Sequence, residues 1–141
     1  MRVTPHFQAI ALSVANLNAM ADWYADALGF VPTRRGEFSA IGAEFVLLAA
    51  PGLTLELISR PAESHTTVDR TPPPDHLSAL GWKALVLNTD DLSALTAHLK
   101  SIEAEIVWAE AFLGPGMKST LIRDPEGNLI NIFATTSGEP T

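Results

Sequence analysis

The sequence predicts an α+β fold built from two tandem modules, each with the element order β-α-β-β-β. The first observation is an internal repeat, because AIALSVANL at 9–17 matches ALVLNTDDL at 84–92, and LTLELI at 53–58 matches NLINIF at 128–133. Positions 9 and 84 and positions 56 and 131 are both 75 residues apart. The other two observations are one amphipathic helical pattern in each half and a set of short apolar runs separated by turn residues. Two separate segments that agree on one offset indicate duplication of a single unit.

The first half reads as a strand, a helix and three further strands. QAIALSV at 8–14 has the character of a β-run, and Asn16 is suited to cap the helix that follows. Gly29 ends this helix, in which apolar residues recur at helical spacing: Leu17, Met20, Tyr24 and Leu28. The remaining strands are predicted within 30–39, 43–49 and 54–59, separated by turns at 41–42 and 51–52.

The second half repeats this order. WKALVLN at 82–88 is a β-run, and Thr89 and Asp90 suit the N-terminus of a helix. The helix is predicted from the apolar residues Leu92, Leu95, Leu99 and Ile102. Three strands follow at 105–111, 119–123 and 129–133, and the segment DPEGN at 124–128 supplies the turn before the last one.

The length of 141 residues predicts a single domain, 1–141, with enough chain to bury a core. Within it we expect a first module at about 5–60, a linker at about 61–80, a second module at about 81–135 and a tail at 136–141. The linker is identified by a stretch at 61–74 that is rich in proline, threonine and charged residues.

Composition and charge narrow the possible partners. The chain is 47% hydrophobic and has a net charge of −7, so we expect a folded protein that repels phosphate backbones and anionic membranes. It has no cysteine, which excludes disulfides and thiol chemistry and is typical of a reducing compartment. The apolar run at 9–15 is too short to span a bilayer. We therefore expect a cytoplasmic protein with no nucleic-acid and no membrane partner.

Three strings carry a resemblance to a known family: ALSVANLNAMADWYADALGF at 11–30, TDDLSALTAHL at 89–99 and RDPEGNLINIF at 123–133. They resemble the vicinal oxygen chelate superfamily, which contains glyoxalase I, extradiol dioxygenases, methylmalonyl-CoA epimerase, and fosfomycin and bleomycin resistance proteins. The likeness covers nearly the whole chain except the linker. It implies that two curled mixed sheets enclose a cleft, with the helices on the outer faces, and that the chain forms a homodimer. The cleft is formed either within one chain or from modules of two chains, and the sequence leaves this open.

The resemblance also assigns four metal-ligand positions, normally His or Gln on the first strand of each module and Glu on the last. In this sequence those positions hold Ala9, Glu56, Ala84 and Asn131, so only Glu56 matches. One carboxylate and one amide are too few ligands for a zinc, iron or nickel site. We therefore predict no metal and no other cofactor.

Glu56 is a carboxylate within an apolar strand. The period of two along a strand places Thr54, Glu56 and Ile58 on one face, and Leu53, Leu55 and Leu57 on the other. Because the leucines suit the face beneath the helix, Glu56 is predicted to point into the cleft. One interpretation is a decayed ligand position at which Glu56 forms a salt bridge or reaches solvent. The other is a carboxylate in an apolar cavity that moves a proton as a general acid or base.

The same alternation predicts a roomy, largely apolar cleft with few polar groups, which is typical of a small-molecule site. His65 and His76 lie in the linker, where they either cover the mouth of this cleft as acid or base or are solvated loop residues. The predicted ligand-binding residues are Ala9, Ala11, Ser13, Thr54, Ile58, Trp82, Ala84, Val86, Asn88, Trp108, Leu129, Asn131 and Phe133.

Three functions follow from this site. The first is a metal-independent isomerase, lyase or cyclase that acts on a hydrophobic organic small molecule, with Glu56 as general acid or base. The alternative is a non-catalytic protein that sequesters such a molecule, as bleomycin resistance proteins do. The third, a metal-dependent glyoxalase or dioxygenase, is disfavoured by Ala9 and Ala84. The sequence leaves the first two functions and the identity of the ligand open.

Overall fold

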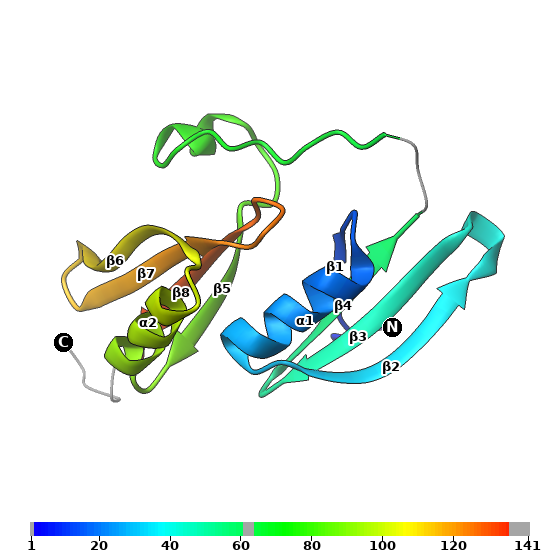
Figure 1. Ribbon diagram of the computed structural model, residues 1–141, viewed down its shortest axis with the longest axis horizontal. Helices are drawn as coiled ribbons and strands as arrows, with labels where there is room; N and C mark the ends of the chain where they lie inside the picture. Colours follow the sequence, from blue (N-terminus) through cyan, green and yellow to red (C-terminus); the bar gives the residue numbers. More distant parts are fainter. Residues whose placement is uncertain (1, 61–63, 136–141) are drawn as a thin grey trace. The chain divides into compact units, whose positions relative to one another are not determined.

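The computed structural model describes residues 2–60 and 64–135, which form two compact units (Figure 1). The first unit ends at His65 and the second begins at Thr66. The first three residues of the predicted linker and the whole predicted tail, 136–141, lie outside the described residues.

The first unit contains one helix and one four-stranded mixed sheet. Strand β1 (Ile10–Ser13) leads into helix α1 (Leu17–Leu28). The remaining strands are β2 (Val31–Phe38), β3 (Ala43–Ala50) and β4 (Leu53–Ser59), and a short 3-10 helix, η1 (Ser39–Ile41), joins β2 to β3. The sheet has the order β1-β4-β3-β2, in which β1 and β4 are parallel and the other neighbours are antiparallel.

The second unit has the same topology. After the 3-10 helix η2 (Asp75–Ser78), strand β5 (Ala84–Thr89) leads into helix α2 (Leu92–Ser101). The sheet order is β5-β8-β7-β6, with β5 and β8 parallel. The other three strands are β6 (Glu105–Gly114), β7 (Met117–Arg123) and β8 (Leu129–Ala134). The predicted α+β class and the two β-α-β-β-β modules are therefore confirmed.

Strand register confirms the internal repeat. Ile10 on β1 pairs with Leu55 on β4, and Leu85 on β5 pairs with Ile130 on β8. The two members of the second pair follow those of the first by the offset of 75 found in the sequence. The repeat therefore places equivalent side chains on equivalent faces of the two sheets.

The helix N-termini follow the same offset. The Asn16 side chain accepts a hydrogen bond from the Ala19 N–H at 3.0 Å, which confirms the predicted cap of α1. The Asp91 side chain accepts from the Ala94 N–H at 2.9 Å, so Asp91 caps α2 and the predicted start at Thr89 and Asp90 is too early. Thr89 is instead the last residue of β5, and Asp90 joins the strand to the cap.

Each helix covers one face of its own sheet (Figure 1). In the first unit, Met20 and Tyr24 of α1 are buried together with Val46, Leu48, Leu55 and Leu57 of the sheet. In the second unit, Leu92, Thr96 and Leu99 of α2 are buried, as are Ile122, Ile130 and Ile132. The Thr96 and Thr120 hydroxyl groups lie 2.8 Å apart, which fixes α2 over β7. We call the opposite side of each sheet, which no described helix of its own unit covers, the open face.

A cluster of charged groups holds the segment before η2 against the second sheet. The guanidinium group of Arg70 donates to both carboxylate oxygens of Glu105, at 2.7 Å to Oε2. The buried guanidinium group of Arg123 donates to the Gly127 carbonyl at 2.7 Å and to the Arg70 carbonyl at 3.4 Å. This part of the predicted linker is therefore built into the second unit. In the described part of the chain, no helix is long and apolar enough to cross a membrane.

Candidate functional site

Glu56 lies in the middle of β4, between β1 and β3. It pairs with Ala11 on β1 and with Leu47 on β3, so these three side chains share the open face of the first sheet. The neighbouring residues Leu55 and Leu57 are 2% and 0% exposed on the helix side. Glu56 itself is half-buried. The alternation read from the sequence therefore places the carboxylate away from the helix.

The Glu56 carboxylate has no protein partner among the described residues. The ion pairs Arg70–Glu105 and Arg123–Glu105 lie in the second unit and do not involve Glu56. Arg34, which lies opposite Leu47 in the same cross-strand row, has its guanidinium carbon 5.9 Å from the centre of the Phe45 ring. One interpretation of the sequence was that Glu56 forms a salt bridge, and no such salt bridge is formed within the described part of the chain.

Apolar and small side chains surround Glu56 on this face. Ile58 and Phe45 are paired across β4 and β3, and Ser13 pairs with Ile58 on the other side. The Phe45 ring stacks on Phe38 with ring centres 4.6 Å apart. The sequence analysis did not predict Phe45 and Leu47 as site residues. The face on which their side chains lie depends on the register of β3 against β4, and knowledge of this register would have identified them.

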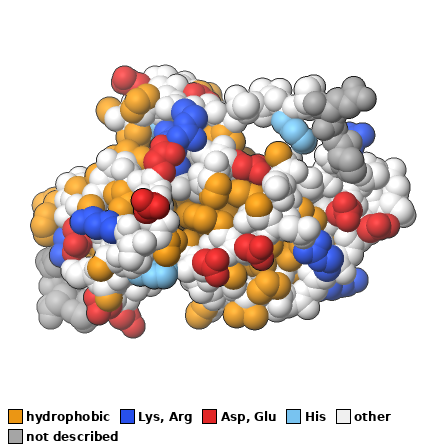
Figure 2. All heavy atoms as spheres, viewed as in Figure 1, with side chains coloured by type: hydrophobic (Ala, Val, Ile, Leu, Met, Phe, Trp, Pro, Cys, Tyr) orange, Lys and Arg blue, Asp and Glu red, His pale blue; other side chains and the backbone are white. Residues whose placement is uncertain are grey.

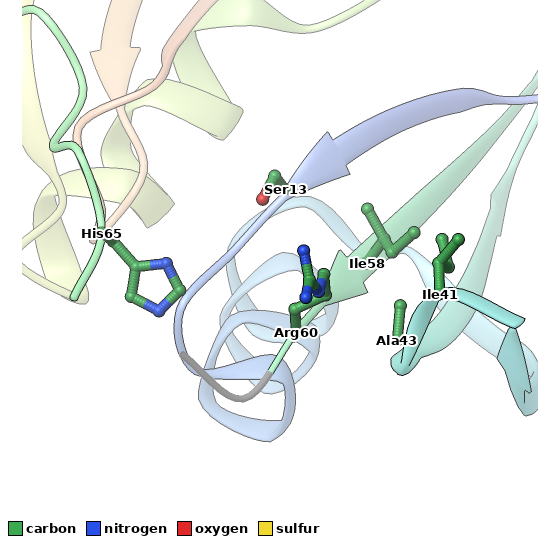
Figure 3. Close-up of a pocket in the computed structure, with 6 residues that line it drawn as sticks. All are labelled: Ser13, Ile41, Ala43, Ile58, Arg60 and His65. Atoms are coloured by element: carbon green, nitrogen blue, oxygen red, sulfur yellow. The ribbon is translucent and has the colours of Figure 1, made fainter. Parts of the chain in front are cut away.

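A hollow of about 470 Å³ opens on the same side of the first unit (Figure 3). Ser13 and Ile58, both predicted to bind ligand, line it. Glu56 does not line it, but it lies two residues before Ile58 on the same face, about 7 Å along the strand. The sequence did not predict three of the lining residues: Ile41, Ala43 and Arg60. The sixth lining residue is His65, which the sequence analysis placed either at the mouth of the cleft or in a solvated loop.

The other predicted residues of the first unit lie nearby in the sheet. Ala9 is half-buried and immediately precedes β1, and Thr54 pairs with Ala49 at the start of β4. Five predicted residues therefore lie on the neighbouring strands β1 and β4: Ala11, Ser13, Thr54, Glu56 and Ile58.

In the second unit, the predicted residues of β5 and β8 form three cross-strand pairs: Ala84 with Leu129, Val86 with Asn131, and Asn88 with Phe133. They share the open face of the second sheet. The Asn131 Oδ1 atom is buried and receives no hydrogen bond from the described residues. The Asn88 Oδ1 atom accepts from the Thr135 hydroxyl at 3.2 Å.

The two predicted tryptophans differ in their surroundings. Trp108 pairs with Leu121 and donates from Nε1 to the Ser119 hydroxyl at 3.0 Å, so it belongs to the second sheet. Trp82 precedes β5 and is 98% exposed. His76 lies in η2, where its carbonyl accepts from the Lys83 ammonium group at 2.8 Å. Its Nδ1 atom is buried without a partner among the described residues.

A family model agrees with this architecture. The model of the Glyoxalase/Bleomycin resistance protein/Dioxygenase superfamily matches residues 6–132. The chain belongs to this superfamily. No curated protein shows significant sequence similarity to the chain.

Solved structures of the superfamily fold are similar over nearly the whole chain. A glyoxylase/bleomycin resistance protein/dioxygenase domain from Frankia sp. EAN1pec has a TM-score of 0.77 and 19% identity, covering 97% of this chain and 96% of its own. TioX from Micromonospora sp. ML1 has a TM-score of 0.67 and 20% identity, and the match covers 94% of this chain and 100% of TioX. The trypanothione-dependent glyoxalase I of Leishmania major has a TM-score of 0.72 and 16% identity, and the match covers 93% of this chain and 87% of the Leishmania chain. At these identities the likeness is one of fold.

The donor set of this superfamily member does not fit the usual chelate site. The alanine side chains at positions 9 and 84 have no donor atom, and Asn131 offers only an amide. Across the described residues, no three His, Asp or Glu side chains are gathered so as to hold a metal ion. A transition-metal site needs three or four such ligands. The described residues therefore do not supply the donor set of the usual chelate site.

Proposed function

We propose that this chain binds an apolar organic small molecule on the open face of its first sheet and acts on it without a metal. Glu56 is the general acid or base of this reaction, which is of the isomerase, lyase or cyclase type. One observation carries the proposal: the Glu56 carboxylate lies half-buried among Ala11, Leu47 and Ile58 without a protein partner in the described chain. A half-buried carboxylate with no protein donor is available to a ligand.

The geometry supports proton transfer between ligand atoms. A carboxylate accepts a proton from one atom of a bound molecule and, once protonated, donates it to another. An isomerisation needs no other reactant, because the proton returns to the same molecule. In an elimination or cyclisation, the same group protonates the leaving or closing atom. An apolar ligand that covers the half-buried carboxylate excludes water from it, which strengthens the interaction between them.

Occluding the open face tests the binding part of this proposal. Ala11→Trp places a large side chain beside Glu56, so compounds that raise the unfolding temperature of the wild type should no longer raise it. Ala97→Trp, on the exposed side of α2 in the second unit, is the matched control and should leave these shifts unchanged. Equal thermal shifts in wild type and Ala11→Trp, over a screen of hydrophobic metabolites, would contradict binding at this face.

Sequestration without chemistry is the second candidate, and one observation favours it. The hollow is lined by Ser13 and Ile58 but not by Glu56, so a molecule bound there is not forced against the carboxylate. This function predicts that a bound compound is recovered chemically unchanged after long incubation with the protein. Mass spectrometry of the recovered compound distinguishes the two candidates, because only the enzyme alters it.

A further inference from the structure

The hollow of the first unit has two chemically different sides. Figure 3 shows Ser13, Arg60 and His65 on one side and Ile58, Ala43 and Ile41 on the other. The first side offers a guanidinium group, an imidazole ring and a hydroxyl group, all of which can donate hydrogen bonds. The second side offers aliphatic carbon alone. A ligand that fits both sides has a polar acceptor group attached to an apolar body.

The charged side chains that line the hollow favour the binding of an anion. Arg60 is exposed and forms no ion pair with any described residue, and none of the six lining residues is acidic. The chain as a whole carries a net charge of −7, and Figure 2 shows acidic side chains scattered over one face, so the molecule as a whole repels anions. Arg60 is therefore a cation at a hollow whose lining holds no carboxylate. The planar guanidinium group pairs best with a carboxylate, which accepts two parallel hydrogen bonds.

Strand alternation relates this cation to Glu56. Glu56, Ile58 and Arg60 are separated by two residues each, so they follow one another along the same face of β4 and its immediate extension. Their order places a carboxylate, an aliphatic side chain and a guanidinium group in one line. The Cα atoms of Glu56 and Arg60 are about 13 Å apart in an extended strand. A molecule held by Arg60 at one end reaches Glu56 only with a carbon remote from that end.

We propose that the ligand is an amphipathic monocarboxylate whose carboxylate is bound by Arg60, with Ser13 and His65 as further donors. Its apolar body lies along Ile58, and the carbon that reacts lies several bonds from the carboxylate, at Glu56. The position of the reacting carbon rests on the proposed function of Glu56. The recognition of the anion is independent of that function, because it depends on the hollow alone.

Octanoate and octanamide are suitable probes, since they share an alkyl chain and differ in the charge of the head group. Isothermal titration should give octanoate an affinity roughly fivefold or more above that of octanamide, as expected for one partly exposed charged hydrogen bond. Butanoate should bind at least roughly tenfold more weakly than octanoate, because each additional buried methylene favours binding. NMR titration should place the largest amide shifts at Ser13, Ile58 and Arg60.

Arg60→Gln removes the cation while keeping a hydrogen-bond donor, so it should abolish the preference for octanoate over octanamide and leave octanamide binding unchanged. Arg35→Gln is the matched control. Arg35 lies on the helix side of the same sheet, where it donates to the Asn18 side chain at 2.7 Å. Its replacement should preserve the preference. Arg60→Lys keeps the charge without the planar fork and should retain part of the preference.

Four results would overturn the inference. These are equal affinities of octanoate and octanamide for the wild type, equal loss of preference in Arg60→Gln and Arg35→Gln, amide shifts confined to other parts of the chain, and no saturable binding of either probe.

Failure of this inference differs from failure of the proposed function. If neutral apolar compounds bind beside Ile58 without any charge preference, only the anion site is wrong. If the charge preference holds but Glu56→Gln changes no reaction, only the catalytic role of Glu56 is wrong.

Discussion

At the residue scale, the Phe45 ring lies over position 36 of β2, where Gly36 leaves room for it because it has no side chain. A Cβ atom at position 36 would lie 2.7 Å from Phe45 Cζ and 2.9 Å from Cε2, closer than carbon atoms pack. Gly36→Ala should therefore displace the ring and lower the free energy of unfolding by about 1–3 kcal/mol. Chemical denaturation monitored by circular dichroism measures this change.

Gly114→Ala is the matched control for Gly36→Ala. A Cβ atom at position 114 meets only the Met117 sulfur, at the ordinary contact distance of 3.5 Å. This substitution should change the free energy of unfolding by no more than about 0.5 kcal/mol. If the two substitutions changed the free energy of unfolding equally, the Phe45 ring could move away from position 36 without loss of stability, and the expectation would be wrong.

At the scale of the elements, the two helices depend on equivalent caps. Asn16→Ala and Asp91→Ala each remove a side-chain acceptor from the third amide of a helix, so each should cost about 1 kcal/mol of unfolding free energy. Asn16→Asp and Asp91→Asn keep the acceptor and should cost less than half as much. Thermal unfolding of the four variants checks this, and a loss no larger for alanine than for the conservative variants would contradict it.

Most of the element order could be predicted from the sequence, because strands and helices here follow simple apolar periodicity. The repeat at an offset of 75 was sufficient to predict both modules. The same offset, applied to Asn16, would also have predicted Asp91 as the second cap. Phe45 and Arg60 were not predicted as site residues for different reasons. Phe45 needs the pairing of β3 with β4, and Arg60 lies just beyond the last residue of β4.

At the scale of the whole molecule, we expect binding to be independent of transition metals, because Ala9 and Ala84 supply no ligand atoms. Dialysis against a chelator should leave the thermal shift caused by a bound compound unchanged. Elemental analysis of protein purified without chelator checks the same point. Near-stoichiometric nickel, zinc, iron or manganese, with loss of binding on its removal, would contradict the expectation.

We also expect a homodimer. Leu80 and Trp82 are 96% and 98% exposed, so a second copy that packed on them would remove apolar surface from water. Sedimentation velocity at micromolar concentration should therefore give a mass near twice the 15.1 kDa of the chain. A single species with the mass of one chain would contradict this assembly.

The role of Glu56 is tested most directly by the turnover of an identified ligand by wild type and Glu56→Gln. Glutamine keeps the shape and hydrogen-bonding capacity of the side chain but cannot exchange a proton, so turnover should fall by roughly a hundredfold or more while the ligand still binds. Glu44→Gln is the matched control, because Glu44 is exposed on β3 and alternates away from the open face. It should retain wild-type turnover. Equal turnover by wild type and Glu56→Gln would contradict the assignment of Glu56 as the general acid or base.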